Sequence, residues 1–538
     1  MKIYSADQIY KADKATIKKQ GITSDELMER AALQLFRWLD MRLEGDDEVK
    51  IHLFCGIGNN GGDGLALARL LHQEGYNIAV YVVNYSKKRS KDFLINLDRL
   101  KSARVWPDFL EAGHDLPKID RYDMVVDAIF GLGLNRPPAD WVIRIFEHLH
   151  RSEAFTVSVD IPSGLFMDAA PKDASAVVQA DHTLSFQVPK LIFFLPGTAV
   201  FSRHWEVLYI GLDEDFLHGM QTDYELIGDL EALGYYLPRQ KFSHKGTYGH
   251  SLIIGGSYGK IGAVHLAAKA CLHSGSGLVT AYIPKCGYIP LQTNLPEAMV
   301  ITDTGEQHIS GIGFDIAPTV IGIGPGLGRD AATVKALEAF LKENDKPLVV
   351  DADALNIISD KPELLDELPP KTVLTPHPKE LERLIGAWKD DFDKLKKTKA
   401  FSKNHDCIVV IKGFHTITIY DGKGYVNTTG NPGMATGGTG DVLTGMITGL
   451  IAQGYEPLNA AVFGVYLHGD AGDIMAEETG LQALTASKLI EGIGEAFIDL
   501  LDRGRELLGG EGEDPLLGDG DDWDDEDWED EDEWDGKY

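Results

Sequence analysis

The strongest chemical pattern in this sequence is a glycine-rich segment at residues 431–446, which reads NPGMATGGTGDVLTGM. Its GTGD portion opens an apolar, helix-like stretch, so it would place backbone N–H groups and the positive end of a helix around an anion. A phosphoryl transfer needs such a cradle for the developing negative charge and a base at the attacking hydroxyl. Asp441 has the chemical type and position of that base. The alternative is a glycine-rich turn in which Asp441 only caps the helix.

Polar groups also follow other strand-like segments of the C-terminal half. Segment 322–328, GIGPGLG, could pass close to a pyrophosphate or a sugar, and Asp351, Asp353 and His377 stand at further strand ends. Residues 412–416, KGFHT, end another strand, where a lysine and small polar groups could hold a nucleotide phosphate. A single histidine is more often structural than a ligand, so both interpretations stay open for His377.

A second glycine-rich segment, GIGNNGGDG at residues 56–64, lies between a strand-like and a helix-like stretch. Gly56, Gly58 and Gly61 have the GxGxxG spacing that lets a backbone approach a pyrophosphate at a helix N-terminus. The usual dinucleotide fingerprint also needs an acidic residue about 20 positions further on, at the end of the second strand. Here that strand ends in Val83, Asn84 and Tyr85. An ordinary hydride-transfer site is therefore disfavoured.

Polar side chains stand instead at the carboxyl ends of three strand-like segments in the N-terminal half. They are Asn59, Asn60, Asp63, Asp127, Asp160 and Ser163. Ligands of open parallel sheets bind at that edge. Any single acid could be a helix cap, but three such strand ends beside two glycine-rich loops favour a site. The side-chain oxygens of Asn60, Asp127 and Ser163 would suit a hard cation.

Short buried strands must position these groups. The N-terminal strands are expected at residues 49–55, 77–83, 123–130 and 155–160. Their apolar residues are continuous rather than alternating, as in parallel strands that are buried on both faces. Two helices precede them, and each begins with a capping box, at Ser5–Gln8 and at Thr23–Glu26. This pattern is typical of a doubly wound α/β domain.

A second series of the same kind predicts a second α/β domain. We expect an N-terminal domain at residues 1–220, a linker at 221–240 with little periodic strand signal, and a C-terminal domain at 241–505. Residues 506–538 form an acidic tail. The tail cannot bury enough apolar area to offset the entropy of ordering it, so we expect it to be disordered. Its three tryptophans could form a docking motif, but a solubilising role is favoured.

The charge of the chain excludes one class of partner. The formal net charge is −32, and residues 511–538 contain 16 acidic residues and one lysine, which leaves −17 for residues 1–510. Neither value suits a nucleic-acid-binding protein, because phosphates require basic surface.

Other features of the sequence predict a cytoplasmic protein without a membrane partner. No apolar run approaches the roughly 18–20 residues that span a bilayer. The N-terminus, MKIYSADQIYKADK, lacks the apolar core of a secretory signal. The four cysteines, Cys55, Cys271, Cys286 and Cys407, have no metal-binding or redox spacing.

Residues 1–215 resemble the YjeF N-terminal family, the NAD(P)HX epimerases. The motifs NNGGDG, DAIFGLGLNR and VDIPSG carry the resemblance, together with the opening helices and DHTLSFQVPK. The resemblance implies a Rossmann-like fold, a hydrated NADH or NADPH as substrate, and a potassium ion held by Asn60, Asp127 and Ser163. It places Asp160 at the reacting carbon. Substrate would also contact Asn59, Asn60, Gly61, Gly62, Asp63, Gly131, Leu132, Gly133, Leu134, Asn135, Arg136 and Pro137.

Residues 235–500 resemble the NAD(P)HX dehydratase branch of the ribokinase-like superfamily. HKGTYG, DADALN, LTPHPKE, GNPGMATGGTGD and HGDAGD carry this second resemblance. It implies that Asp441 activates the ring hydroxyl for phosphorylation by ADP or ATP with magnesium. The hydrated dinucleotide would contact Ala263, Gly328, His377 and Asp441. The adenine nucleotide would contact Lys412, Gly413, Phe414, His415, Thr416 and Gly440.

The leading hypothesis is therefore a bifunctional repair enzyme of two doubly wound α/β domains. One domain would interconvert the R and S epimers of hydrated NAD(P)H, and the other would dehydrate the S epimer. A small-alcohol or vitamin-precursor kinase with a non-catalytic first domain is the alternative enzyme, and an interaction scaffold is the alternative outside enzymes. We also expect a homo-oligomer.

Overall fold

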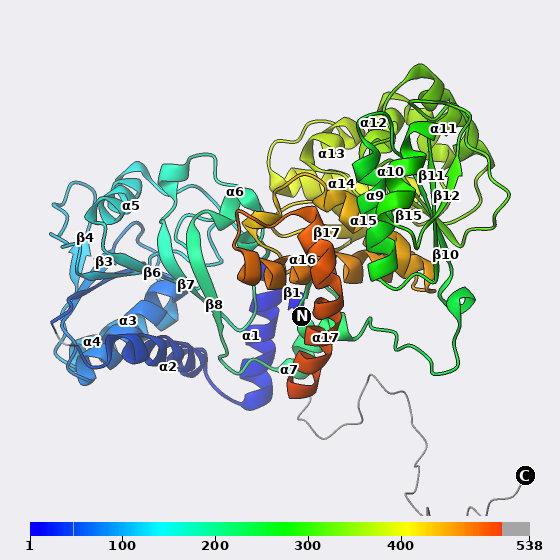
Figure 1. Cartoon of the computed structure of the whole chain (residues 1–538). Helices are drawn as coiled ribbons and strands as arrows, with labels where there is room; N and C mark the ends of the chain where they lie inside the picture. Colours follow the sequence, from blue (N-terminus) through cyan, green and yellow to red (C-terminus); the bar gives the residue numbers. More distant parts are fainter. Residues whose placement is uncertain (47, 508–538) are drawn as a thin grey trace, which may run out of the picture.

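The computed structural model describes residues 1–46 and 48–507, which form two α/β domains that lie side by side (Figure 1). Within these residues the N-terminal domain has a seven-stranded sheet in the order β4-β3-β2-β5-β6-β7-β8. Every neighbouring pair in it is parallel. The strands are β2 (Ile51–Cys55), β3 (Ile78–Val83), β4 (Asp108–Leu110), β5 (Met124–Ala128), β6 (Phe155–Val159), β7 (Ala180–Phe186) and β8 (Ser202–Leu208).

Helices cover both faces of this sheet. Leu53 and Cys55 of β2 pack in one core cluster with helices α2, α3 and α4, whereas Phe54 packs in another cluster with α5. The helices of this domain are α1 (Ala6–Gln20), α2 (Ser24–Leu43), α3 (Asn59–Gln73), α4 (Lys91–Ser102), α5 (Asp140–Ser152), α6 (Pro196–Ala199) and α7 (Glu214–Gly219). Both predicted capping boxes form, at Ser5 and at Thr23. The prediction of a doubly wound arrangement is confirmed.

The C-terminal domain contains an eleven-stranded sheet within the described residues, in the order β1-β9-β18-β17-β16-β15-β14-β13-β10-β11-β12. Neighbours are parallel from β16 to β12, and β17 pairs antiparallel with both β16 and β18. The strands are β1 (Lys2–Ile3), β9 (Tyr224–Ile227), β10 (His250–Ile254), β11 (Leu278–Ile283), β12 (Met299–Thr302), β13 (Val320–Ile323), β14 (Leu348–Val350), β15 (Thr372–Leu374), β16 (Cys407–Ile411), β17 (Ile417–Tyr420) and β18 (Lys423–Asn427).

Helices again pack on the two faces of this larger sheet. The helices are α8 (Asp229–Leu233), α9 (Ile261–His273), α10 (Tyr288–Asn294), α11 (Ala331–Glu343), α12 (Ala352–Asp360), α13 (Pro378–Ile385), α14 (Asp391–His405), α15 (Thr439–Ala452), α16 (Pro457–Thr479) and α17 (Ala486–Leu507). Val349 of β14 packs with α15 and α16, while its neighbour Val350 packs with α11, α12 and α13. Helix α15, which begins in the GTGD segment, is buried from Val442 to Ala452.

The segment expected as a linker, residues 221–240, contributes to the large sheet. It contains β9, which pairs parallel with β18 and antiparallel with β1 at the N-terminus. The N-terminal strand of the chain therefore belongs to the sheet of the C-terminal domain. Strands of two and four residues are too short to show a periodic pattern, which is why they could not be predicted from the sequence.

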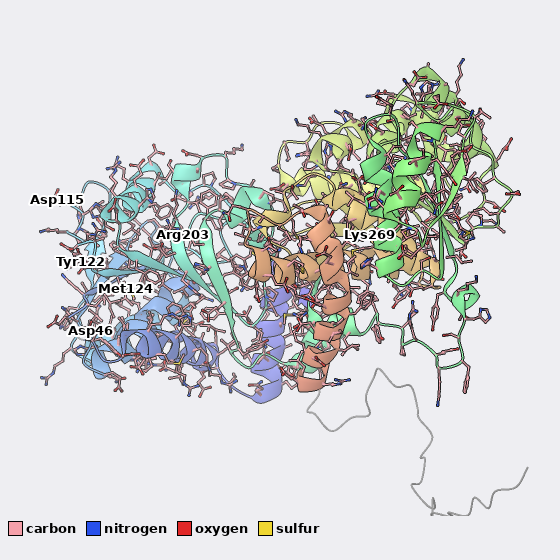
Figure 2. All side chains as sticks on the ribbon, viewed as in Figure 1. Asp46, Asp115, Tyr122, Met124, Arg203 and Lys269 are labelled. Atoms are coloured by element: carbon pink, nitrogen blue, oxygen red, sulfur yellow. The ribbon has the colours of Figure 1, made fainter. Side chains whose placement is uncertain are left out.

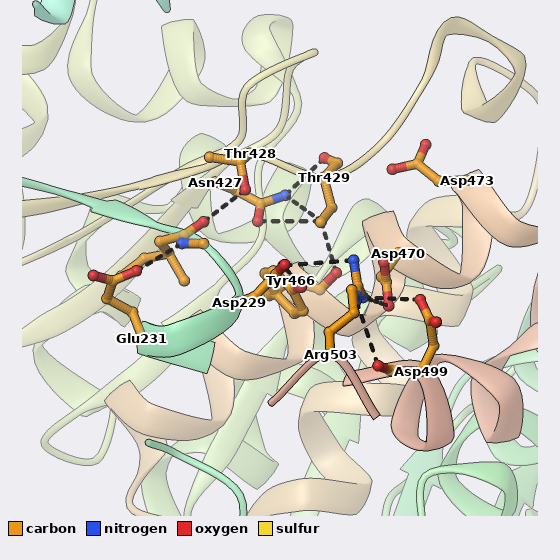
Figure 3. Close-up of polar contacts among 12 residues, drawn as sticks. Asp229, Glu231, Asn427, Thr428, Thr429, Tyr466, Asp470, Asp473, Asp499 and Arg503 are labelled. Carbon is orange, nitrogen blue, oxygen red and sulfur yellow. Dashed lines mark hydrogen bonds and ion pairs between the residues drawn. The ribbon is translucent and has the colours of Figure 1, made fainter. Parts of the chain in front are cut away.

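A polar network fixes this segment to the C-terminal helices (Figure 3). Arg503 of α17 pairs with Asp470 of α16 at 2.7 Å and with Asp499 at 3.1 Å. Asp229, at the start of α8, lies 3.5 Å from Arg503 and accepts a hydrogen bond from the Tyr466 hydroxyl. The end of β9 is therefore tied to two helices of the second domain.

The two domains also meet through side chains that occupy the space between them (Figure 2). The rings of Phe194 and His415 pack edge to face with centroids 5.1 Å apart. The backbone N–H of Gly197 donates to Asp391 Oδ2 at 2.7 Å. The segment that follows β7 thus contacts the second domain near the predicted nucleotide loop.

The C-terminal end of the structure bears on two of the sequence predictions. Helix α17 continues to Leu507, so the first two residues of the expected tail are helical, and residues 508–538 lie outside the described residues. In the part of the chain that the structure describes, no helix is both long and apolar enough to cross a membrane.

We predict that Ile3→Ala destabilises the C-terminal domain, although residue 3 comes before the strands of the N-terminal domain in the sequence. Ile3 is 4% exposed and packs in the core cluster that includes Leu226 and Val426. Loss of the buried side chain should cost about 2–5 kcal/mol of unfolding free energy. Differential scanning calorimetry should show a lower Tm for the C-terminal transition. Ile289→Ala, at a side chain that is 73% exposed, is the matched control and should leave Tm unchanged.

Candidate functional site

A cavity of about 770 Å³ opens at the carboxyl edge of the N-terminal sheet. Most of the substrate-contacting residues implied by the resemblance line it. They are Asn59, Asn60, Asp63, Gly131, Leu132, Gly133, Leu134, Asn135, Arg136, Pro137 and Asp160. Gly61 and Gly62 are buried beneath the cavity wall, and a Cβ on Gly62 would lie 2.7 Å from Met28 Sδ. These two glycines permit close packing of the loop.

Asp160 is held at the end of β6 by a buried lysine. Its backbone has φ +66°, an uncommon conformation for a residue with a side chain. Asp160 Oδ1 accepts hydrogen bonds from Lys190 Nζ at 2.6 Å and from the Phe186 N–H at 3.1 Å. Lys190 is fully buried, and it also donates to Ser185 Oγ and to the Phe186 carbonyl. The Asp160 carboxylate is therefore fixed and paired with a positive charge.

Our sequence interpretation did not select Lys190 as a site residue. Little in the sequence indicated a functional role for Lys190. It is a single lysine at the end of the segment DHTLSFQVPK, where it could equally be a solvent-exposed residue after a strand. Burial lowers the pKa of Lys190, and the Asp160 carboxylate opposes that shift. A buried ammonium with a carboxylate partner at the edge of a cavity marks a functional site more often than a structural one.

The three residues predicted to hold a cation lie together beside the cavity. Ser163 donates to Asp127 twice, from Oγ at 2.6 Å and from its backbone N–H at 2.8 Å. Asn60 Nδ2 and Ser163 Oγ both donate to the Phe130 carbonyl, at 3.0 and 3.2 Å. One carboxylate, one amide, one hydroxyl and one carbonyl group together offer the oxygen donors that hard cations take. The Phe130 carbonyl could not be found from the sequence, because every residue has one.

Helix α1 contributes two polar side chains to the cavity that the sequence did not single out. Tyr10 and Asp13 line it together with Ile9 and Ile17 of the same helix. Burial, and then the nearby Asp160 carboxylate, raise the pKa of Asp13 to about 6. The sequence placed these residues on a capped amphipathic helix with no glycine-rich loop nearby, so it did not indicate that they belong to a site.

In the C-terminal domain, Asp441 lies in the first turn of α15 as the GTGD segment predicted. The turn begins at Gly438, whose φ of +96° is unfavourable for any residue with a Cβ. Burial, and then the Asp351 carboxylate, raise the pKa of Asp441 to about 7, while the Lys412 ammonium opposes the shift. Asp441 is thus placed between charges of both signs, and near neutral pH it exchanges a proton.

Lys412 and Asp351 form the charged centre of this second site. Lys412 Nζ lies 2.8 Å from Asp351 Oδ1, and Thr444 Oγ1 donates to Asp351 Oδ2 at 2.8 Å. A Cβ on Gly440 would lie 3.3 Å from Lys412 Nζ. Strands β14 and β16 and helix α15 therefore bring their polar ends together at one place.

Another acid, Asp353, bonds to one of the predicted dinucleotide contacts. Asp353 Oδ2 accepts from the Gly328 N–H at 2.9 Å and from Lys260 Nζ at 3.2 Å. Ala263 lies in the first turn of α9, against Gly326 of the GIGPGLG loop. Ala263 and Gly328 thus lie on neighbouring loops at the same edge of the sheet.

His377 has a structural role that the sequence left open. It is the N-cap of α13, where its Nδ1 accepts from the Lys379 N–H at 3.1 Å. Its side chain is 47% exposed, and burial together with the Lys412 ammonium lowers its pKa. The other ring nitrogen, Nε2, lies 3.3 Å from Glu380 Oε1.

The loop expected to hold an adenine nucleotide presents one exposed ring and one anchored ring. Phe414 is 60% exposed, whereas His415 Nδ1 is 3.0 Å from the Asn427 carbonyl. Thr416 Oγ1 donates to the Gly413 carbonyl at 3.1 Å and so closes the turn.

The HGDAGD segment holds the loop that precedes α15. Asp473 of α16, labelled in Figure 3, accepts from the Gly430 N–H at 2.7 Å and from Asn431 Nδ2 at 2.8 Å. This contact fixes the start of the GNPGMATGGTGD segment. The HGDAGD motif could be identified in the sequence, but its role in anchoring this loop could not.

Comparisons with known proteins agree in both halves of the chain. Residues 251–494 match a family described as NAD(P)H-hydrate dehydratase, and residues 24–192 match one described as YjeF-related protein N-terminus. The bifunctional NAD(P)H-hydrate repair enzyme Nnr of Moorella thermoacetica is 34% identical over 507 residues, which cover 91% of this chain and 96% of that protein. The enzyme of the same name from Escherichia coli is 32% identical over 502 residues, 90% of this chain and 92% of that protein.

The C-terminal half of this chain is similar to a solved structure. That structure is the ADP/ATP-dependent NAD(P)H-hydrate dehydratase of Bacillus subtilis, co-crystallised with ATP and Mg²⁺. It is 28% identical, with a TM-score of 0.45, and it covers 51% of this chain and 97% of that one.

We predict that Gly61→Ala destabilises the N-terminal domain. The new Cβ would lie 1.9 Å from the Gly56 carbonyl oxygen, so the loop beneath the cavity would have to move. Such overpacking should cost about 1–3 kcal/mol, measured as a lower Tm of the N-terminal transition. Gly58→Ala is the matched control, because its nearest neighbour, Tyr85 Oη, is 3.9 Å away. Equal Tm values for the two variants would contradict this interpretation of the loop.

Proposed function

Because this chain belongs to the family of bifunctional NAD(P)H-hydrate repair enzymes, we propose that it returns hydrated NADH and NADPH to their reduced forms through two separate sites. The N-terminal site interconverts the R and S epimers, and the C-terminal site dehydrates the S epimer at the expense of ADP or ATP. One observation carries the assignment: Asp160 and Asp441 stand at the carboxyl edges of two different sheets. Lys190 pairs with Asp160, and the Lys412 ammonium is near enough to Asp441 to oppose the rise in its pKa.

In the N-terminal site, Asp160 is the residue proposed to act on the reacting carbon. That carbon carries a hydroxyl beside the ring nitrogen, so water can leave with help from the nitrogen lone pair and return on the other face. A positioned carboxylate moves the proton in each direction. Lys190 fixes the orientation of the Asp160 carboxylate, and the loops at 59–63 and 131–137 hold the dinucleotide.

A potassium ion is proposed to bind Asn60, Asp127 and Ser163, with the Phe130 carbonyl as a fourth oxygen. The support is the donor set, which is all oxygen and includes a single carboxylate. When bound, the ion would supply positive charge beside the loops that face the substrate.

In the C-terminal site, Asp441 is proposed to accept the proton of the ring hydroxyl. The hydroxyl oxygen then bonds to the terminal phosphorus of ADP or ATP, and the nucleotide leaves one phosphoryl group shorter. Phosphate departs as the C–O bond breaks, and the neighbouring carbon loses a proton to restore the ring double bond. Phosphorylation is needed because phosphate is a better leaving group than hydroxide.

Residues around Asp441 are proposed to divide the remaining tasks. Ala263, Gly328 and His377 contact the hydrated dinucleotide, and Gly440 with the 412–416 loop holds the adenine nucleotide. Magnesium would neutralise charge on the nucleotide phosphates. The Lys412 ammonium, 2.8 Å from Asp351, is the protein's own cation at that place.

The proposed function is tested by following reduced-nicotinamide absorbance from a mixed-epimer sample of hydrated NADH with ADP, ATP or no nucleotide. Full recovery with one nucleotide is expected, since the first site supplies S epimer to the second. Asp160→Asn should stop fast recovery near the S-epimer fraction. Asp441→Asn should abolish recovery, by at least about 100-fold in rate, while R-to-S exchange continues.

Each variant serves as the folding control for the other, because each keeps the activity of the opposite domain. Loss of both activities in one folded variant would contradict the two-site scheme. No recovery with either nucleotide would favour the small-alcohol kinase instead.

We further predict that dehydration of purified S epimer depends on pH through Asp441. Its pKa is raised to about 7, and the base form exists above that value, so kcat should rise as the pH increases through about 7. Lys412→Met removes a positive charge that stabilises the carboxylate, so the midpoint should move to higher pH. kcat is measured from pH 5 to 9 at saturating nucleotide. An unchanged midpoint in Lys412→Met would contradict the assignment of Asp441 as the base.

A further inference from the structure

Three carboxylates line the N-terminal cavity, and no role described so far uses one of them, Asp13. Asp13 projects from helix α1, on a different element from Asp160, and both side chains line the same 770 Å³ cavity. The Asp13 side chain is half-buried. Within residues 1–46 and 48–507, no hydrogen bond or ion pair involves its carboxylate. An unpaired acid in such a place is free to bind a ligand.

The surroundings of Asp13 and Asp160 differ in charge. Asp160 contacts the Lys190 ammonium at 2.6 Å. Asp13 has no such partner, and burial and the Asp160 charge raise its pKa to about 6. Two further groups face the same space, Asp63 of α3 and Tyr10 of α1, and burial raises the pKa of each. In the cavity, Asp160 is paired with an ammonium, whereas burial raises the pKa of Asp13 and that of Asp63.

We propose that Asp13 is the second acid–base group of the epimerisation, serving one face of the hydrated ring while Asp160 serves the other. This inference rests on the function proposed for the N-terminal domain and adds to it a division of labour between two carboxyl groups. Two acids on separate elements can reach two faces of one ring, whereas a single carboxylate would have to serve both.

The proposed steps conserve atoms and charge. The ring nitrogen lone pair forms a C=N bond as the C–O bond breaks, and the departing hydroxyl takes the Asp13 proton and leaves as water. Water then attacks the opposite face, the C=N electron pair returns to nitrogen, and Asp160 accepts the released proton. The reverse reaction uses the same groups in opposite roles. Solvent protons restore the starting state between turnovers.

The test measures R-to-S exchange by chromatography of the two epimers, without nucleotide, for the full chain and three variants. Asp13→Asn keeps the shape of the side chain and removes its proton transfer. We expect a fall in kcat of at least about 100-fold with KM within about threefold. Asp13→Glu retains a carboxylate and should recover part of that loss. Asp7→Asn is the matched control on the same helix, at a 74% exposed acid, and should behave like the unsubstituted chain.

Two additional readouts separate a chemical role from a structural one. Dehydration of purified S epimer should be unchanged in Asp13→Asn, because that site is in the other domain. In the unsubstituted chain the exchange rate should fall as the pH rises through about 6, and this dependence should be absent in Asp13→Asn.

Each remaining outcome would overturn the inference. An unchanged kcat in Asp13→Asn, or a loss confined to KM, would leave Asp13 as a binding residue at most. Equal loss in Asp13→Asn and Asp13→Glu, with the pH dependence retained, would assign it a structural role. Absence of exchange in the unsubstituted chain would overturn the proposed epimerase activity itself, and that result is distinct from failure of Asp13 alone.

Discussion

Parallel pairing of short buried strands is the constraint on which the rest of this protein depends. Parallel strands present all their carboxyl ends at one edge of the sheet, so loops that are distant in sequence converge there. In the N-terminal sheet this brings Asp127 and Asp160 to the same edge, where Asp160 lines the cavity. In the C-terminal sheet the same rule brings Asp351 and Lys412 to the start of α15. The helices on both faces bury the strands.

The sequence predicted the parts of this arrangement that have a local signature. Continuous apolar strands, capping boxes and glycine-rich loops were visible, and so were acids at strand ends such as Asp160 and Asp441. Contributions that depend on tertiary structure were not visible. The burial of Lys190 follows from the packing of the segment after β7, and the position of Asp13 follows from the way α1 lies across the cavity. The pairing of β1 with β9 has no local signal, because each strand is very short.

The two sites are separate, but a short physical connection runs between them. Lys190 contacts Asp160 at 2.6 Å, and four residues later Phe194 packs against His415 in the proposed nucleotide loop. A displacement of Lys190 or of Phe194 would also move the contiguous, mostly buried segment between them, since Phe194 is 3% exposed. The bonds of Asp473 to the loop before α15 give the second site a further rigid support.

The N-terminal strand has a consequence for the order in which the chain is assembled during translation. The Met1 ammonium donates to the Leu226 carbonyl, 225 positions away, and pairs with Glu231. Strand β1 therefore has no sheet partner until the chain has been synthesised as far as β9. Their neighbour β9 in turn needs β18, which begins only at Lys423. Strand β1 therefore joins the completed sheet late in folding, after β9 and β18 have both been synthesised.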